Sequence, residues 1–293
     1  MFLASFRIVA ARPSARQSHR GEALSRCFFH SKQPLNLGSR TKNNNLILRR
    51  IIRFQRRFYR SSPPSLHKNP NILPYTFIGI CCAGCAFSNY AKRYEPGFLE
   101  PIYRHAVCSL RNLREGRYYT LLTSSFTHFE PTHLFMNMLG LLSFGPFVVS
   151  VFGPGAFLVL WIGGSLVCDT ATLYWDWLAE RASQARVVKV WGQILRRPEA
   201  IVERRSLGAS GSVLGMFAVY ACASPNSMVT LFPLPVPIKA WIVVGLFAGG
   251  SAYCAVNGLF PSIGHMGHLG GMAFGAGWYY TQGRRLLRRL GRF

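Results

Sequence analysis

The chain has 293 residues, of which 49% are apolar, and it carries a formal net charge of +24. In a water-soluble protein such a charge would point to nucleic acid as a partner. Here the charge is unevenly distributed, because residues 69–91, 131–168, 206–238 and 240–283 contain no Lys, Arg, Asp or Glu. About 20 apolar residues are enough to cross the hydrocarbon core of a bilayer. The composition therefore excludes a soluble nucleic-acid-binding domain and predicts an all-α polytopic protein in a lipid bilayer.

The N-terminal region, residues 1–71, holds 15 Lys or Arg and one acidic residue, Glu22. Its first part is rich in Arg and Ser and lacks a long apolar segment, which is typical of a mitochondrial transit peptide rather than a secretory signal. Arg26 to Ser31 resembles a presequence-processing motif. Residues 44–60 alternate apolar and basic clusters and either form a membrane-surface helix or continue the targeting region. We interpret 1–71 as a transit peptide and a basic, largely disordered N-terminal region.

The apolar pattern then predicts a domain of six helices over residues 72–281, followed by a basic tail, 282–293. A polar loop, 91–131, follows the first helix, and the sequence FGPG at 152–155 separates the second helix from the third. An amphiphilic insertion, 178–206, precedes the fourth helix, and PLPVP at 233–237 excludes a helix before the fifth. The predicted helices cover approximately 72–90, 132–151, 156–177, 208–223, 238–256 and 264–281.

Six spans place both termini on the same side of the membrane, and both termini are basic, as the positive-inside rule requires. The basic insertion 178–206 lies on the opposite side, which weakens this orientation without reversing it. With the N-terminus in the matrix, the second, fourth and sixth helices all begin on the outer side.

The eight cysteines do not resemble a disulfide framework, because most of them lie in apolar segments where Cys acts as a small hydrophobic residue. Cys82 and Cys85 have CxxC spacing, but no second pair accompanies them. We predict no metal or redox site there.

Polar side chains at the starts of the predicted helices are the strongest functional signal. Polar groups inside a membrane are functional by default, although each one alone also fits a helix cap or an interhelical hydrogen bond. Ser210 opens the fourth helix, and a serine becomes an effective nucleophile only when a base accepts its proton. Histidine is the usual base, and the sixth helix carries two candidates, His265 and His268. His133 and Asn137 lie on one face of the second helix, and His128 precedes it.

Glycines indicate which histidine meets the serine. Small residues four apart allow two membrane helices to approach closely. Gly211 and Gly215 have this spacing on the fourth helix, and Gly271 and Gly275 have it on the sixth. His268 lies on the same stripe as the second pair, whereas His265 has no glycine three residues later. We therefore favour His268 as the base.

Three motifs together resemble the rhomboid family of intramembrane serine proteases over residues 72–281. They are GASG at 208–211, the array His128/His133/Asn137, and HxxGxxxG starting at His268. The resemblance implies a rhomboid-like six-helix transmembrane bundle, with Ser210 as nucleophile and His268 as base in a dyad without an acid. Neither Asp169 nor Asp176 is given a triad role. The family's Trp-Arg pair in the first loop is Gly116-Arg117 here.

The resemblance also implies roles for the surrounding residues. The oxyanion hole would consist of His128, Asn137 and the backbone N–H of Ser210. His133, Gly208, Gly211, Gly271 and Gly275 would support it. No metal ion and no cofactor is implied.

The resemblance further implies a multi-pass protein of the mitochondrial inner membrane, with its site open to the intermembrane space. Its substrates would be single-pass membrane proteins, such as a dynamin-like GTPase or a cytochrome c peroxidase precursor, with no nucleic acid as partner. The main alternative is an inactive rhomboid-fold protein that binds membrane helices without cutting them. A transporter or channel is disfavoured because no internal repeat is visible. A zinc protease lacks its HExxH motif, and an aspartyl protease lacks its GxGD motif.

Overall fold

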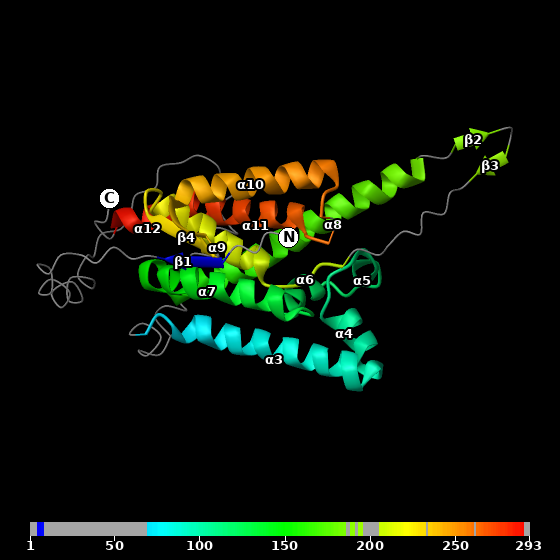
Figure 1. Ribbon diagram of the computed structural model, residues 1–293, viewed down its shortest axis with the longest axis horizontal. Coiled ribbons are helices and arrows are strands. Elements are labelled where there is room, and N and C mark those ends of the chain that lie inside the picture. The colour runs from blue at the N-terminus through cyan, green and yellow to red at the C-terminus, as the bar shows by residue number, and fades with distance from the viewer. Residues whose placement is uncertain are drawn as a thin grey trace, which may run out of the picture.

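The computed structural model describes residues 5–8, 69–185, 188–190, 193–195, 205–232, 234–260 and 262–289. Within these ranges six long helices form a bundle, which confirms the predicted helical membrane fold (Figure 1). They are α3 (Ile72–Tyr94), α7 (Pro131–Phe152), α8 (Pro154–Ala185), α9 (Ser210–Ala223), α10 (Ala240–Asn257) and α11 (His265–Trp278).

The six helices differ in their capacity to span a bilayer. Four of them, α3, α7, α8 and α10, are long and apolar enough to cross a membrane. α9 and α11 have 14 residues each, which corresponds to about 21 Å against about 30 Å of hydrocarbon. α9 is buried on every side from Gly211 to Ala221, which identifies it as the central helix. The first residue of α9, Ser210, therefore lies inside the bundle.

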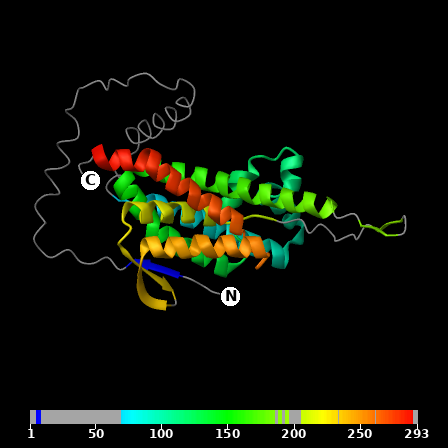
Figure 2. The ribbon, with the colours of Figure 1, turned by 90° about the horizontal axis from the view of Figure 1, so that it is seen from above.

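α3 and α10 lie at the periphery. α10 buries only Ala240, Val243 and Ser251 and follows the outer edge of the bundle (Figure 2). The apolar residues that it exposes, including Leu246 and Val256, suit contact with lipid chains, which are as apolar as the residues themselves.

α8 is longer than the sequence predicted, because it continues past 177 to Ala185 and projects beyond its neighbours in Figure 1. The amphiphilic insertion was predicted to begin at 178, but its first residues continue the helix, and Asp176 just before them is buried. Exposed Tyr174 follows the apolar part, and the guanidinium of Arg181 lies 4.3 Å from the ring centroid of Trp177. Aromatic and basic residues of this kind gather where a helix leaves the bilayer.

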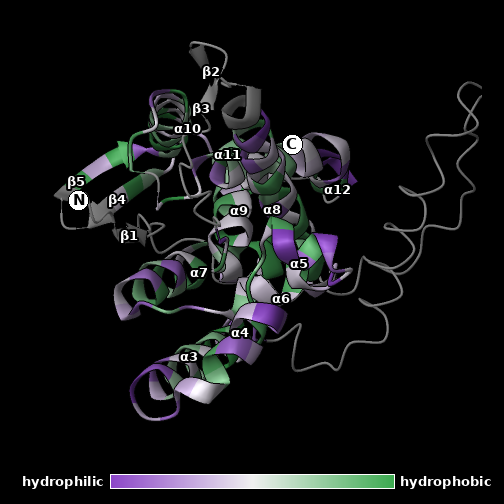
Figure 3. Ribbon diagram, turned by 90° about the vertical axis from the view of Figure 1, so that its right-hand side faces the viewer, coloured by the Kyte–Doolittle hydropathy of each residue, from purple (hydrophilic) through white to green (hydrophobic). Residues whose placement is uncertain are grey.

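The predicted polar loop 91–131 is partly helical and packs on one end of the bundle. Its hydrophilic residues are visible on α4 and α5 in Figure 3. Ser109 starts α5 by accepting a hydrogen bond from the backbone N–H of Asn112, which is the usual action of an N-cap serine. The loop elements are η2 (Pro96–Phe98), α4 (Leu99–His105), α5 (Leu110–Arg114), α6 (Thr120–Thr123) and η3 (Ser124–Phe126).

The remaining segments are short. Residues 234–237 of the PLPVP segment are strand and not helix, and they belong to an antiparallel pair of β4 (Met228–Phe232) and β5 (Leu234–Lys239). β1 (Ser5–Ile8) pairs antiparallel with β4, although it lies in the region expected to be largely disordered. The processing motif and residues 44–60 lie outside the described residues. Other short elements are β2 (Val188–Val190), β3 (Gln193–Leu195), the π-turn η4 (Tyr279–Gly283) and α12 (Arg284–Arg289).

Candidate active site

Ser210 and His268 meet across the interface between α9 and α11. The Ser210 Oγ lies 3.1 Å from the His268 Nε2, within hydrogen-bond distance for a hydroxyl that donates to an imidazole. Both side chains are half-buried. The other ring nitrogen of His268, Nδ1, has no hydrogen-bond partner among the described residues. The geometry is thus that of a Ser-His pair in which no carboxylate from the described part of the chain contacts the imidazole.

The second histidine of α11 points elsewhere. His265 begins the helix, and its Nε2 lies 3.1 Å from the carbonyl oxygen of Leu259. It therefore donates to the preceding loop and is not the partner of Ser210.

Glycines bring α9 and α11 close enough for the dyad to form. A Cβ added to Gly215 would lie 3.0 Å from the carbonyl oxygen of Gly271. A Cβ added to Gly275 would overlap the carbonyl oxygen of Gly215, and one added to Gly271 would overlap that of Gly211. Gly211 itself faces Cys168 of α8. Any side chain at these positions would push the helices apart, since membrane helices approach this closely only through small residues.

His133 and Asn137, both on α7, face the turn that leads to Ser210. A Cβ added to Gly208 would lie 2.6 Å from the Cε1 of His133, 2.9 Å from its Nε2 and 3.5 Å from the Nδ2 of Asn137. Gly208 has φ +107°, a conformation that glycine adopts without strain. The turn therefore passes directly against two side chains that can donate hydrogen bonds.

His128 behaves differently from its expected role as an oxyanion donor. It is fully buried, and its Nε2 accepts the backbone N–H of Ala209 at 3.3 Å and lies 3.1 Å from the Asn137 Nδ2. A ring nitrogen that accepts a backbone N–H carries no proton, so the proton of the neutral ring is on Nδ1. Burial, reinforced by nearby His133 and opposed by the Phe126 backbone, lowers the pKa of His128 to about 3. At neutral pH His128 is therefore an acceptor that holds the Ala209 and Asn137 amides.

A family model described as "Rhomboid domain" matches residues 115–285, which include all the residues of this site. The chain belongs to the rhomboid family. The match covers more than half of the chain and agrees with the bundle of long helices described above.

Curated relatives are also rhomboid proteins. The chain is 30% identical over 182 residues to "Rhomboid protein 1, mitochondrial" of Saccharomyces cerevisiae, covering 59% of this chain and 46% of the yeast protein. It is 27% identical over 241 residues to "RHOMBOID-like protein 12, mitochondrial" of Arabidopsis thaliana, covering 82% and 66%. It is 26% identical over 177 residues to "Presenilin-associated rhomboid-like protein A, mitochondrial" of Danio rerio, covering 58% and 38%. The chain thus spans less than two thirds of the length of each of these relatives.

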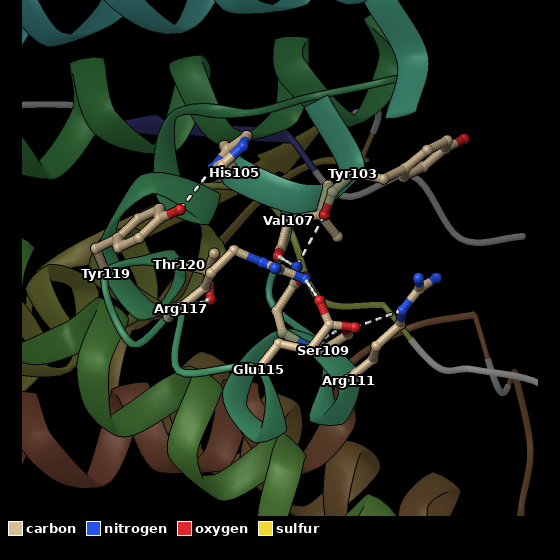
Figure 4. A network of polar contacts seen from close by, with 10 residues as sticks. Tyr103, His105, Val107, Ser109, Arg111, Glu115, Arg117, Tyr119 and Thr120 are labelled. Carbon is tan, nitrogen blue, oxygen red and sulfur yellow. Dashed lines mark hydrogen bonds and ion pairs between the residues drawn. The ribbon is translucent and has the colours of Figure 1, made fainter. Parts of the chain in front are cut away.

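The first loop of this rhomboid domain contains a network of polar contacts that includes Arg117, Glu115 and Arg111 (Figure 4). The buried Asn112 Nδ2 donates to the carbonyl oxygens of Tyr103 and Val107 at 2.8 and 2.7 Å. Its Oδ1 accepts from the Nε and Nη2 of Arg117 at 3.1 and 2.8 Å. Arg117 also pairs with Glu115. The arginine kept in the Gly116-Arg117 pair therefore has a defined structural partner within the loop.

Two neighbours of the site were given no role from the sequence: Phe247 was not considered, and Asp169 was named only to exclude it from a triad. Phe247 of α10 lies 5.9 Å, centroid to centroid, from the ring of His268, and nothing in the apolar pattern of α10 distinguishes it from other residues. Asp169 of α8 is buried beside the segment that precedes Ser210. A carboxyl group inside a membrane helix indicates a functional site, and on that ground the sequence could have identified Asp169.

Proposed function

We propose that the chain is an intramembrane serine endopeptidase that cleaves transmembrane or membrane-adjacent segments of its substrates. The observation that carries this proposal is the 3.1 Å approach of the Ser210 Oγ to the His268 Nε2, at the first residue of the buried helix α9. A serine placed only for packing has no need of an imidazole aimed at its hydroxyl. The match to the rhomboid domain also supports serine protease chemistry.

The mechanism follows from the dyad. The Ser210 Oγ attacks the carbonyl carbon of the scissile peptide bond while the His268 Nε2 takes the hydroxyl proton. The carbon–nitrogen bond then breaks, and the imidazolium returns the proton to the departing amine. An acyl-enzyme ester remains on Ser210. Water, deprotonated by His268, hydrolyses this ester and restores the serine.

The developing oxyanion requires hydrogen-bond donors, and we assign them to the Ser210 N–H, the Asn137 Nδ2 and the His133 Nε2. The first N–H groups of a helix have no intrahelical partner and favour negative charge. Asn137 has two amide hydrogens, of which the contact with His128 uses one. This replaces the expected donor His128 with His133, because the Nε2 of His128 is already an acceptor for the Ala209 N–H. His128 then acts by positioning the Asn137 side chain.

The membrane setting supports substrates that are themselves membrane helices. α9 has 14 residues, fewer than α7 and α8, and is too short to cross the hydrocarbon core by itself. We infer that Ser210, its first residue, lies below the membrane surface, where a partly unwound membrane segment can meet it. The curated names of the three relatives above are mitochondrial, and residues 1–71 have the composition of a transit peptide. We assign the chain to the mitochondrial inner membrane, with single-pass membrane proteins as its substrate class.

The test is covalent labelling of the detergent-solubilised protein with a fluorophosphonate probe. The variants are Ser210→Ala, His268→Ala and His265→Ala. We expect labelling to be lost in the first two and kept in the third, because His265 bonds to the Leu259 carbonyl oxygen instead of the serine.

A folded wild type that does not label would contradict the proposal and favour a rhomboid protein that binds helices without cutting them. Loss of labelling in His265→Ala with retention in His268→Ala would show that the base is misassigned. A wild type that labels should then be incubated with single-pass membrane protein candidates, with Ser210→Ala as the inactive control.

A further inference from the structure

Asp169 lies near the middle of α8, and hydroxyl groups engage both of its carboxylate oxygens. The Ser124 Oγ donates to its Oδ2 at 2.6 Å, and the Ser206 Oγ donates to its Oδ1 at 2.7 Å. Asp169 is only 5% exposed. A buried carboxylate is tolerated where its oxygens are hydrogen-bonded in this way. The His268 Nδ1 has no hydrogen-bond partner among the described residues, so Asp169 is not a third member of the proposed dyad.

The two hydroxyls belong to segments that are far apart in the sequence. Ser124 is in η3, at the end of the first loop, and its own carbonyl oxygen accepts the N–H of Gly208 at 2.9 Å. Ser206 exchanges two backbone hydrogen bonds with Cys108 of the same loop, at 2.9 and 2.8 Å. The first loop therefore holds the turn 206–209 by its backbone at two points, and the carboxylate of Asp169 joins the side chains on both sides.

We propose that Asp169 is a positioning residue for the reaction assigned above, on which this inference rests. It fixes the turn 206–209, and through that turn it sets the direction of the Ser210 N–H and the position of Gly208 against His133. Its effect is exerted through the turn and involves no contact with the substrate or with the imidazole.

This role predicts which kinetic constant changes. Without the carboxylate, Ser124 and Ser206 lose their common acceptor and the turn can shift relative to α7. A displacement of about 1 Å at a catalytic group lowers rates by about 100-fold. Access of a small probe to the site does not depend on the turn. We therefore expect Asp169→Ala to lower the maximal rate of fluorophosphonate labelling (kinact) by about 10- to 100-fold, with little change in its half-saturating concentration (KI).

The experiment compares Asp169→Ala with Asp169→Asn and with Ser165→Ala in the full-length chain. Asn can still accept from one hydroxyl and donate to the other, so it should restore most of kinact. Ser165 is a matched control, because its buried hydroxyl on the same helix bonds to the Ser212 Oγ at 2.9 Å and does not touch the turn. Ser165→Ala should lower the thermal stability without a comparable loss of kinact.

Hydrogen–deuterium exchange gives a readout that is independent of activity. Peptides covering 206–209 should exchange faster in Asp169→Ala than in the wild type or Ser165→Ala, because Asp169 no longer holds Ser124, whose carbonyl oxygen accepts the Gly208 N–H. Unchanged exchange and unchanged kinact in Asp169→Ala would overturn the inference. A loss of kinact that only matches the loss of stability, as in Ser165→Ala, would also overturn it. A wild type that does not label would contradict the proposed protease, while the exchange data would still decide whether Asp169 holds the turn.

Discussion

Gly208 and His133 are in contact: a Cβ added to Gly208 would lie 2.6 Å from the Cε1 of the imidazole. The contact joins the turn before the proposed nucleophile to the first turn of α7. The position of Gly208, two residues before Ser210, therefore depends on the position of a side chain from another helix.

Substitution of Gly208 by Ala should abolish most of the labelling. The added methyl group would displace His133, and the φ of +107° is strained for any residue with a Cβ. Because His133 is one of the assigned oxyanion donors, its displacement should lower the labelling rate by about 100-fold or more. Gly97→Ala is the matched control, since a Cβ there meets nothing within 4 Å. Equal labelling rates in the two variants would contradict this prediction.

Substitution of Gly275 by Ala should separate α9 from α11. The added methyl group meets the carbonyl oxygen of Gly215, and backbone atoms cannot move away as a flexible side chain can. Overpacking of this kind destabilises by about 1–3 kcal/mol and should also break the dyad. Gly277→Ala, two residues further along the same helix, meets nothing within 4 Å and should retain both the unfolding temperature and the labelling. The measurements are thermal unfolding and fluorophosphonate labelling of both variants. Equal unfolding temperatures and equal labelling in the two would contradict this prediction.

His133→Ala and His128→Ala should fail in different ways. Loss of an oxyanion donor lowers the catalytic rate by about 100- to 1,000-fold, so His133→Ala should fold normally but label slowly. His128→Ala leaves the Ala209 N–H and one Asn137 hydrogen without their acceptor, at about 1–3 kcal/mol for an unsatisfied buried group. It should therefore lower the unfolding temperature as well as the rate. If His128→Ala keeps wild-type stability but loses activity, His128 is the donor after all.

Acid should destabilise the fold through His128. Its pKa is about 3 in the folded chain, compared with 6.5 for an unperturbed histidine. Below about pH 6.5 the unfolded chain binds a proton that the folded chain does not bind. The free energy of unfolding contributed by this group is therefore complete above about pH 6.5 and decreases as the pH falls toward 3.

Thermal unfolding in detergent should accordingly show a lower midpoint at about pH 5 than at about pH 7.5. The difference should be smaller in His128→Gln, which cannot titrate. An identical pH dependence in His128→Gln would show that other groups carry the effect.

In the first loop, Arg117→Ala should be more harmful than Arg111→Ala. The Arg117 side chain is 11% exposed and donates twice to the buried Asn112. A hydrogen bond to a charged group contributes about 1.5–3 kcal/mol. The Arg111 pair with Glu115 is 59% and 37% exposed, and exposed pairs contribute about 0–1 kcal/mol. Unfolding temperatures of the two variants should differ in this order, and the reverse order would refute the importance of the Asn112 network.

The helices of the bundle could be predicted from the sequence, because the uncharged segments are long enough for one or two helices each and FGPG and PLPVP mark breaks within them. The roles of His128 and His133 could not. α7 begins at Pro131, so His128 lies before the helix. The five-residue spacing between His128 and His133 therefore does not predict where the His128 side chain points. The short helices of the first loop depend on capping and on contacts with α8 and residues 206–209, which no local pattern reveals. The close approach of α9 and α11 could be predicted from the glycine spacing, because small residues four apart allow membrane helices to pack closely.

The two members of the dyad come from the first turn of α9 and the first turn of α11, and they meet only when those helices are packed together. In the proposed mechanism, Ser210 therefore has no base until α11 has packed against α9. A chain that ends before α11 would carry a serine with ordinary reactivity. The order of the elements along the chain thus delays the proposed activation of the serine until the last long helix of the bundle has taken its place.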